Sequence, residues 1–281
     1  MGSVRKQISV TKFDGRRQPF DKQKVFNTCV RMHATPEAAQ DIADKVEQRA
    51  YDGIPTKEVL RLVFAFLRKY NPEIRHVTDL RTAISMLRPK PDFELFVAQL
   101  LRAYGHEVKS NQMVRGMCVE HEIDAIAEKG GRIFYVEVKH HYKPHTYTSL
   151  DVFLEARATF EDLCEGYKNG NNKIKFDKAI VVSNTKLSDH AKMYAECRGI
   201  DYIAWKAPID RGLERMIEEK KMYPITLLRE LDVDIEARLG DAGIVTLKQL
   251  AEMSESEIRR MTNIPKKTVR ELKKKATVFG T

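Results

Sequence analysis

The chain has 281 residues, with 49 Lys or Arg against 40 Asp or Glu, so its formal net charge is +9 at pH 7. This length predicts two or three domains, and the positive balance is typical of a protein that meets a polyanion such as nucleic acid. The sequence contains no apolar run long enough for a membrane span and begins without a signal peptide's apolar core. Its four cysteines form no C-x-x-C pair, which argues against a cysteine-based zinc site and indicates a cytoplasmic protein with reduced thiols.

The first segment, residues 1–88, begins with a predicted β-hairpin. Residues 8–20 alternate polar and apolar side chains around Asp14-Gly15, which is a strong short-range hairpin signal. Three residues then occupy positions typical of helix N-caps: Asp21, Thr35 and Thr56. With a fourth helix that ends near residue 87, the prediction is a hairpin followed by a small helical bundle.

Short motifs within this segment resemble the ATP-cone, a regulatory nucleotide-binding module of many ribonucleotide reductases. The motifs are V-x-K-x-D-G from Val10, F-D-x-x-K from Phe20, and Asp-Gly-Ile with a following threonine from Asp52. The resemblance implies that ATP or dATP binds as an effector through four residues: Val10, Lys12, Lys24 and Thr56. Lysines at such positions suit triphosphate oxygens. The chain has no P-loop, so the nucleotide would regulate activity and not drive it.

A different interpretation of the same residues remains open. Lys12 and Lys24 are also explained as solvated surface charges on a bundle that binds DNA or protein.

Residues 88–91, Arg-Pro-Lys-Pro, predict a stiff basic linker, and a second domain is expected over residues 89–220. An amphipathic helix follows from Asp92 and ends at Gly105, with Glu94 in its first turn. Taken alone, Glu94 is explained as a favourable charge at a helix N-terminus.

Residues 120–141 predict two strands, Ile123–Ala127 and Ile133–Lys139, around a Gly-containing turn. Glu137 and Lys139 are two apart, so both side chains leave the same face, and Asp124 can be brought opposite them. Two carboxylates and a lysine at one point are suited to hold a hard divalent cation and a water against a phosphodiester. The alternative is an edge hairpin with a solvated charged face.

The remainder of this segment predicts a helix over 148–167, a buried strand over 176–182, a helix over 187–198 and a strand over 200–204. Strand, helix and strand in this order indicate a parallel pair with a crossover. His140, His141 and His145 lack acidic or cysteine partners at zinc spacing, so phosphate contacts or solvation are expected of them. His121 is expected to be structural.

The F-E helix start, His-Glu-Ile-Asp, Glu-Val-Lys and the later strand–Ser-Asn–helix order resemble Mrr-like restriction endonuclease domains of the PD-(D/E)xK superfamily. The resemblance implies an α/β sandwich with a mixed sheet that cleaves double-stranded DNA. It implies that Asp124, Glu137 and the Val138 carbonyl bind Mg²⁺ or Mn²⁺, and that Glu94 completes or recruits the site. Lys139 would orient the attacking water and stabilise the developing negative charge.

The last segment, residues 221–281, predicts short helices and so a small all-α domain, with Thr246 and Ser254 as helix caps. Turns at Gly243 and Asn263 resemble helix-hairpin-helix repeats, which bind DNA phosphates. Residues 259–275 hold eight Lys or Arg and one acid. The candidate DNA contacts are Lys266, Lys267, Arg270, Lys273 and Lys274. The alternative is a basic surface helix without a partner, or one that contacts protein.

Together these patterns predict a three-domain, cytoplasmic, Mg²⁺-dependent endodeoxyribonuclease of restriction type, regulated by ATP or dATP, with no membrane partner. A DNA repair or junction nuclease is an alternative with the same chemistry. A nucleotide-responsive DNA-binding regulator with an inactive nuclease fold is an alternative of another class, and the sequence leaves a homodimer open.

Overall fold

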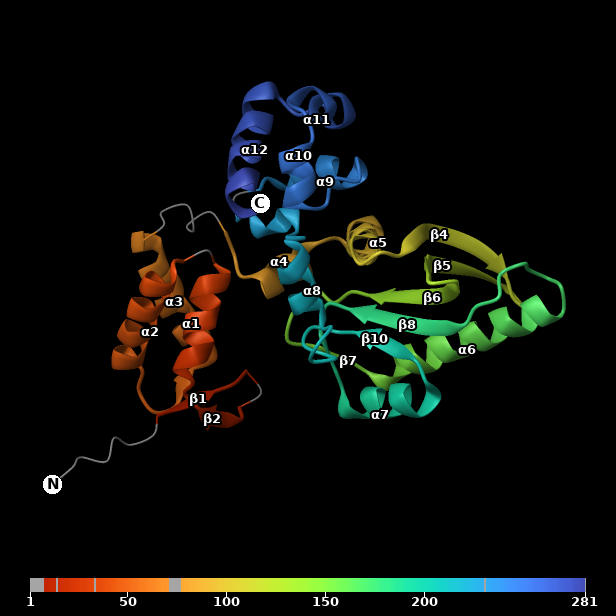
Figure 1. Cartoon of the computed structure of the whole chain (residues 1–281), viewed down its shortest axis with the longest axis horizontal. Coiled ribbons are helices and arrows are strands. Elements are labelled where there is room, and N and C mark those ends of the chain that lie inside the picture. Colours follow the sequence, from red (N-terminus) through yellow and green to blue (C-terminus); the bar gives the residue numbers. More distant parts are fainter. Residues whose placement is uncertain (1–7, 14, 33, 71–76, 230, 281) are drawn as a thin grey trace. The chain divides into compact units, whose positions relative to one another are not determined.

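The computed structural model of the chain describes residues 8–13, 15–32, 34–70, 77–229 and 231–280. The chain forms two compact units, Met1–Val77 and Thr78–Thr281, with mixed α/β structure and a helical C-terminal region (Figure 1). The multidomain α/β class predicted from the sequence is confirmed.

The first unit contains a three-stranded sheet. β1 (Ser9–Thr11) pairs antiparallel with β2 (Arg17–Pro19), which is the predicted hairpin, and parallel with β3 (Ile54–Pro55), which the sequence did not predict. Gly15 has a φ of +80°, a conformation that the turn needs and that glycine adopts freely. The other residue of the predicted turn signal, Asp14, lies outside the described residues.

Helices α1 (Lys22–Arg31), α2 (Pro36–Arg49) and α3 (Thr56–Tyr70) follow these strands. Side chains of two predicted caps accept hydrogen bonds from main-chain amides of the helix that follows: Asp21 and Thr35. Thr56 differs from the prediction, because α3 begins at this residue and its hydroxyl donates to the Thr11 carbonyl oxygen at 3.2 Å. That hydrogen bond ties the start of α3 to β1.

The second unit is built on a five-stranded mixed sheet with the order β10-β8-β6-β5-β4. Its strands are β4 (Glu107–Arg115), β5 (Glu120–Lys129), β6 (Arg132–Lys139), β8 (Lys178–Ser183) and β10 (Asp201–Ile203). β4, β5 and β6 pair antiparallel, whereas β6, β8 and β10 pair parallel. The predicted β5–β6 hairpin therefore lies inside the sheet, which excludes the edge-hairpin alternative.

Strand β4 was not predicted. Its sequence, EVKSNQMVR, has few apolar residues, and as the outermost strand it buries little of its surface. Ser110 and Gln112 occupy half-buried positions of β4, so the apolar alternation on which sequence-based prediction depends is missing.

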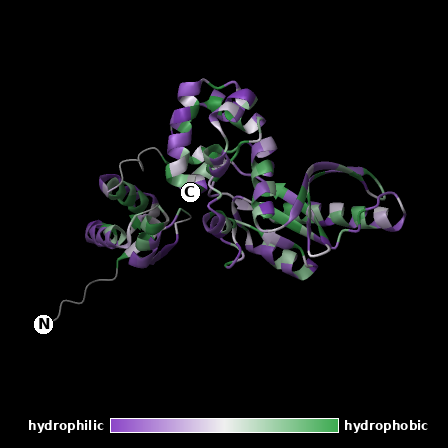
Figure 2. Cartoon of the chain, turned by 45° about the horizontal axis from the view of Figure 1, so that its top comes forward, coloured by the Kyte–Doolittle hydropathy of each residue, from purple (hydrophilic) through white to green (hydrophobic). Residues whose placement is uncertain are grey.

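Helices cover both faces of the sheet (Figure 1). Tyr135 and Val136 are neighbours on β6 and point to opposite faces, yet they are 1% and 0% exposed. The ring of Tyr135 belongs to a core cluster with residues of α6 (Leu150–Lys168) and α7 (Asp189–Arg198), while α5 (Glu94–Ala103) packs on β4 and β5. The inner strands are coloured as mainly hydrophobic in Figure 2, as expected of strands buried on two sides.

Smaller elements complete the part of this unit that contains the five-stranded sheet. β7 (Tyr147–Thr148) pairs parallel with β9 (Lys186–Leu187), and α8 (Leu213–Lys220) packs on α5. The predicted strand–helix–strand crossover is confirmed by β8, α7 and β10, since β10 is parallel to β8.

Within its described residues, 221–229 and 231–280, the C-terminal region contains a 3-10 turn, η3, and four helices: η3 (Ile225–Leu227), α9 (Val233–Asp241), α10 (Leu247–Glu252), α11 (Glu255–Thr262) and α12 (Lys266–Gly280). The expected helix at the start of this region is thus only one turn. Thr246 and Ser254 form capping boxes with Gln249 and Glu257. Asn263 ends α11 with a φ of +53°, which asparagine tolerates.

The predicted fourth N-terminal helix, α4 (Leu80–Met86), lies in the second unit. It is joined to η3 by a hydrogen bond of 2.7 Å from the Thr226 hydroxyl to the Ala83 carbonyl oxygen. Among the helices of the described residues, none is both long and apolar enough to cross a bilayer.

Candidate active site

The antiparallel ladder between β5 and β6 ends beside three of the predicted site residues. Ala125 and Val136 form the last main-chain pair of this ladder, and beyond it a side-chain carboxylate, instead of a carbonyl group, accepts from the neighbouring strand. Oδ2 of Asp124 accepts a hydrogen bond of 2.8 Å from the Val138 N–H, and Asp124 is 8% exposed. The main chain of β6 therefore fixes the Asp124 carboxylate next to the strand positions of Glu137 and Lys139.

Glu137 is held by a residue of its own strand. The hydroxyl of Tyr135 donates to Oε2 of Glu137 at 2.5 Å, because residues two apart on a strand leave the same face. Burial raises the pKa of Glu137, the Tyr135 hydrogen bond lowers it, and the charge of Asp124 raises it further. The net shift is upward, so Glu137 is a carboxylate crowded by another negative charge in a buried place.

Glu94 is the first residue of α5, and its side chain is 11% exposed. Burial and then the charge of Asp124 raise the pKa of Glu94 to about 7. The structure thus brings Asp124 close enough to both Glu94 and Glu137 for its charge to raise the pKa of each.

The ammonium of Lys90 lies among carboxylates at this place. Its Nζ is 3.1 Å from Oε1 of Glu122, 3.2 Å from Oε1 of Glu94 and 3.4 Å from Oδ1 of Asp124. Burial by itself would lower the pKa of Lys90, but the hydrogen bond to Glu122 and the charges of Asp124 and Glu94 raise it. Lys90 belongs to a turn, η2 (Pro89–Phe93), immediately before α5.

Sequence reasoning did not find Lys90, Glu122 or Tyr135 as site residues. Lys90 was assigned to a basic linker, and no local pattern connects it with a strand thirty residues later. A signal did exist for the other two, because Glu122 precedes Asp124 by two residues and Tyr135 precedes Glu137 by two. Each pair shares a strand face, so alternation could have identified both.

The donor set suits a hard divalent cation. Carboxylate oxygens are the ligands that Mg²⁺ and Mn²⁺ prefer, and a bound cation would offset the burial and the charge of Asp124 that raise the pKa values of Glu94 and Glu137. Within the part of the chain that the structure describes, no group of three or more His, Cys, Asp or Glu stands in an arrangement that would hold a metal ion. Instead, the carboxylates of Glu94, Glu122 and Asp124 surround the ammonium of Lys90.

Lys139 ends β6, and its charge partly offsets the rise in the pKa of Glu137 that burial and Asp124 cause. After the hydrogen bond with Ser149, it also contributes to the lowered pKa of Asp151 at the start of α6, so Lys139 lies near both carboxylates.

Two of the histidines after β6, His140 and His141, differ from the prediction of solvation or phosphate contact, whereas His145 is exposed. His140 is half-buried, its Nε2 lies 3.1 Å from the Ile84 carbonyl oxygen, and its ring packs on Phe93. His141 Nε2 lies 3.1 Å from the Thr148 hydroxyl, in a buried cluster of hydroxyl groups. These contacts are structural, because they join β6 to neighbouring elements.

His121 is structural as predicted, since its Nε2 lies 2.7 Å from Oδ2 of Asp162. The Asp162 carboxylate also accepts a hydrogen bond from the Cys118 N–H, so it fastens the turn between β4 and β5 to α6.

In the first unit, the predicted nucleotide residues lie at the sheet and at the helix starts. Val10 is 8% exposed and pairs with Ile54, so its side chain is part of the core. Lys12 lies in the hairpin turn, and its N–H donates to the Arg16 carbonyl oxygen. Lys24 is exposed and forms an ion pair of 3.2 Å with Asp21.

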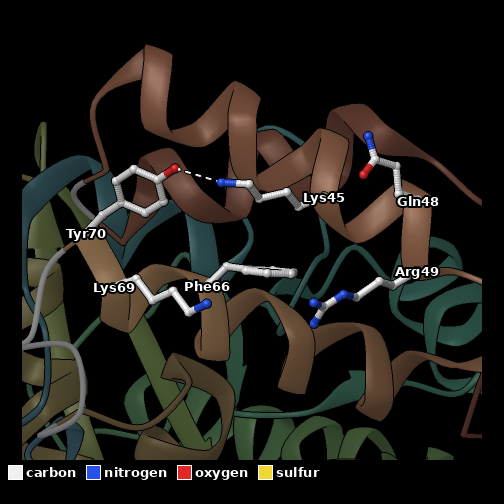
Figure 3. Close-up of a pocket in the computed structure, with 6 residues that line it drawn as sticks. All are labelled: Lys45, Gln48, Arg49, Phe66, Lys69 and Tyr70. Carbon is white, nitrogen blue, oxygen red and sulfur yellow. Dashed lines mark hydrogen bonds between the residues drawn. The ribbon is translucent and has the colours of Figure 1, made fainter.

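A hollow of about 340 Å³ in this unit is lined by other residues of α2 and α3: Lys45, Gln48, Arg49, Phe66, Lys69 and Tyr70 (Figure 3). The guanidinium of Arg49 lies 4.8 Å from the centre of the Phe66 ring, and Lys45 Nζ lies 3.2 Å from the Tyr70 hydroxyl. The predicted nucleotide residues do not line this hollow.

The C-terminal basic residues are not equivalent. Lys266, Lys267 and Lys274 are exposed on α12, and Arg270 is exposed but hydrogen-bonded to Glu255 at 3.3 Å. Lys273 differs from its prediction as a DNA contact. Its ammonium donates to the carbonyl oxygens of Leu250 at 3.3 Å and Ala251 at 2.7 Å, and to that of Met253, so it caps the end of α10.

Family models match three successive parts of the chain. The ATP cone domain matches residues 8–86, the restriction endonuclease domain matches residues 88–207, and the AF1548-like C-terminal domain matches residues 223–278.

Parts of the chain are similar to known proteins and to a solved structure. An uncharacterized protein of Archaeoglobus fulgidus is 35% identical over 184 residues, which are 66% of this chain and 100% of that protein. A solved structure, titled as the crystal structure of the protein of unknown function AF1548, is 34% identical with a TM-score of 0.58 and covers 72% of this chain and 99% of that one. A DNA-directed RNA polymerase subunit alpha of Mycoplasmoides gallisepticum is 34% identical over 107 residues, which are 37% of this chain and 31% of that subunit. The chain therefore belongs to the AF1548-like family, whose restriction endonuclease domain and C-terminal domain here follow an ATP cone.

Proposed function

We propose that the protein is a metal-dependent endodeoxyribonuclease that hydrolyses phosphodiester bonds of double-stranded DNA. The observation that supports this most is that Asp124 lies near both Glu94 and Glu137 at the end of β6, within a restriction-endonuclease-like domain. Three carboxylates in a part-buried place are costly unless a cation or a proton neutralises them.

Asp124 and Glu137 hold Mg²⁺ or Mn²⁺ together with the carbonyl of Val138 in this proposal, and Glu94 completes the ligand set. The bound ion would supply Lewis acidity toward a phosphate oxygen. The protein prepares two ligands in advance, because Asp124 is oriented by the Val138 N–H and Glu137 by the Tyr135 hydroxyl. Such outer hydrogen bonds orient metal ligands and increase their affinity.

Lys139 orients the attacking water and stabilises negative charge that develops on the phosphate. It follows Glu137 by two residues and leaves the same face of β6, so it can act on the same reacting group. Its positive charge already acts on Glu137.

The other two parts of the chain would bind a regulator and hold the DNA. ATP or dATP binds to the cone through Val10, Lys12, Lys24 and Thr56 and alters cleavage. The exposed cations of α12, namely Lys266, Lys267, Arg270 and Lys274, contact DNA phosphates. Lys273 is left out of this set because its ammonium is engaged with main-chain carbonyls.

The proposed division remains residues 1–88, 89–220 and 221–281, and the proposed compartment is the cytoplasm.

The test is a plasmid cleavage assay with supercoiled and linear DNA, methylated and unmethylated. The wild-type protein and Asp124→Asn are each assayed with Mg²⁺ or Mn²⁺, and then with excess EDTA. Each condition is repeated with and without ATP or dATP. The proposal expects metal-dependent cleavage that EDTA and the substitution both remove. Cleavage by Asp124→Asn at the wild-type rate would overturn the assignment. Tight DNA binding without cleavage under every condition would favour a DNA-binding regulator with an inactive nuclease fold.

A further inference from the structure

Lys90 has an arrangement that neither its place in a linker nor the nuclease motif explains. We propose that Lys90 is a built-in counter-cation of the nuclease site, and that a divalent metal ion binds by exchanging with its ammonium. This inference rests on the proposed metal-dependent function of the same carboxylates.

The ammonium of Lys90 lies against oxygens of three carboxylates. Lys90 Nζ is within 3.4 Å of oxygens from Glu94, Glu122 and Asp124, which come from the start of α5 and from β5. Two of these carboxylates are proposed to face the metal ion. An ammonium at this position competes with a divalent ion for the same oxygens, because both are bound by the negative charge of the cluster.

Without a bound metal ion, the carboxylates of Glu94 and Asp124 need a compensating positive charge. The side chains of Glu94 and Asp124 are 11% and 10% exposed, so water can neutralise their charges only in part. Like charges in such a place repel strongly, and removing one partner of a buried ion pair leaves an uncompensated charge. Lys90 supplies the compensating charge when no metal ion is bound.

The Lys90 ammonium has an open route along which it can exchange with a metal ion. The Lys90 side chain is 57% exposed, and Glu122 on the solvent side of the cluster is 52% exposed. The ammonium can therefore leave the carboxylates into solvent without any opening of the core. Its flexible four-carbon stem allows this movement while the main chain stays in place.

The main chain on each side of Lys90 is held firmly. Arg88 and Asp92 form two hydrogen bonds of 2.8 Å with each other across the turn, and Arg88 also donates to Asp241 of α9 at 2.8 Å. Lys90 is thus anchored at its backbone and exposed at its charged end. This combination keeps the ammonium near the site in both states.

Metal binding without DNA tests the exchange. Isothermal titration calorimetry with Mn²⁺ is carried out on the full chain of wild type, Lys90→Met and Lys90→Arg. Lys90→Met is expected to bind Mn²⁺ at least about tenfold more tightly, because no ammonium competes. Lys90→Arg keeps the charge and is expected to stay within about threefold of wild type. Equal or weaker binding by Lys90→Met would overturn the inference.

The midpoint of thermal unfolding is a second readout, which does not require a calorimetric titration with the metal ion. In EDTA, Lys90→Met is expected to unfold at a lower temperature than wild type, and added Mn²⁺ is expected to raise its midpoint more than that of wild type. Lys175→Met is the matched control, since Lys175 is exposed and precedes β8 at the end of the sheet opposite Lys139. An equal gain from Mn²⁺ in wild type and Lys90→Met would also contradict the exchange.

Asp124→Asn separates this inference from the proposed function. If wild type binds no Mn²⁺, or if Asp124→Asn binds it as well as wild type does, the metal site itself is wrong and both proposals fall. If Asp124→Asn loses binding while Lys90→Met binds like wild type, the nuclease proposal stands and only the exchange with Lys90 fails.

Discussion

Asp92 and Arg88 form a bidentate ion pair whose carboxylate is fully buried. Nε and Nη2 of Arg88 each lie 2.8 Å from an oxygen of Asp92, and the Asp92 side chain is 0% exposed. The same guanidinium donates to Asp241, so a residue just before the candidate active site is fastened to α9 of the C-terminal region. The segment with Lys90 and Glu94 therefore depends on contacts far away in the sequence.

Replacement of Asp92 by Ala is expected to destabilise the protein by about 1.5–3 kcal/mol, because it removes two charge-assisted hydrogen bonds from a buried carboxylate, while Arg88 is 34% exposed and keeps Asp241 as a partner. Asp241→Ala is the matched control and should cost less than about 1 kcal/mol, since that side chain is 67% exposed. Urea unfolding monitored by circular dichroism measures both. Equal losses from the two substitutions would show that burial of the pair does not govern its contribution.

Gly240 of α9 is expected to reject even a methyl group. A Cβ at this position would lie 2.4 Å from Oδ1 of Asp92 and 2.6 Å from Nη2 of Arg88. Glycine to alanine inside a helix ordinarily stabilises by about 0.5–1 kcal/mol, whereas Gly240→Ala should destabilise. A rise in the unfolding midpoint of Gly240→Ala would mean that α9 moves away from the ion pair at little cost.

Tyr135→Phe is expected to lower cleavage without unfolding the protein. The substitution keeps the buried ring but removes the hydrogen bond to Glu137, which orients that carboxylate. Loss of an outer partner of a metal ligand typically costs about 10–100-fold in metal affinity or activity. Steady-state cleavage at several Mg²⁺ concentrations should show a higher metal requirement, while the unfolding midpoint changes little. Wild-type metal dependence in Tyr135→Phe would contradict an orienting role.

Glu94 should make the stability of the metal-free protein depend on pH. Burial and the charge of Asp124 raise the pKa of Glu94 from 4.5 to about 7, so the folded state holds a proton that the unfolded state releases between these values. Stability contributed in this way is present below about pH 4.5 and is lost as the pH rises to about 7. Glu94→Gln should remove this loss, which is at most about 3.5 kcal/mol, given about 1.4 kcal/mol for each pKa unit.

Urea unfolding in EDTA between pH 5 and 8 measures this effect, with Glu128→Gln, an exposed residue at the other end of β5, as the control. The stability of Glu94→Gln relative to wild type should increase with pH. Parallel pH profiles for wild type and Glu94→Gln would exclude a raised pKa at Glu94.

Lys273 and Lys274 are adjacent on α12, but replacing the first is expected to affect stability and replacing the second is expected to affect DNA binding. Lys273→Ala should lower the free energy of unfolding by about 1–2 kcal/mol, since it removes the donor for carbonyls at the end of α10. Lys274→Ala should leave stability nearly unchanged and reduce the slope of log K against log salt for DNA binding by up to about 0.9, one phosphate contact. Fluorescence anisotropy with a DNA duplex at several salt concentrations measures the slope. If Lys273→Ala changed only the slope, its capping role would be wrong.

Much of the local structure could be predicted from the sequence. The caps at Asp21, Thr35, Thr246 and Ser254 and the β5–β6 hairpin are specified by residues within a few positions of one another. The nearness of Asp124 to Glu137 also followed, because a short hairpin leaves little choice of register.

Only the tertiary structure decided which charges meet. Lys90 reaches Glu122 and Asp124 across more than thirty residues, Arg88 reaches Asp241 across 153, and Lys273 turns back to α10. None of these pairs has a periodic spacing, so no local pattern marks them. Helix caps, turns and strand alternation are short-range and are written in the sequence, whereas a long, flexible charged side chain finds its partner only after the elements have packed.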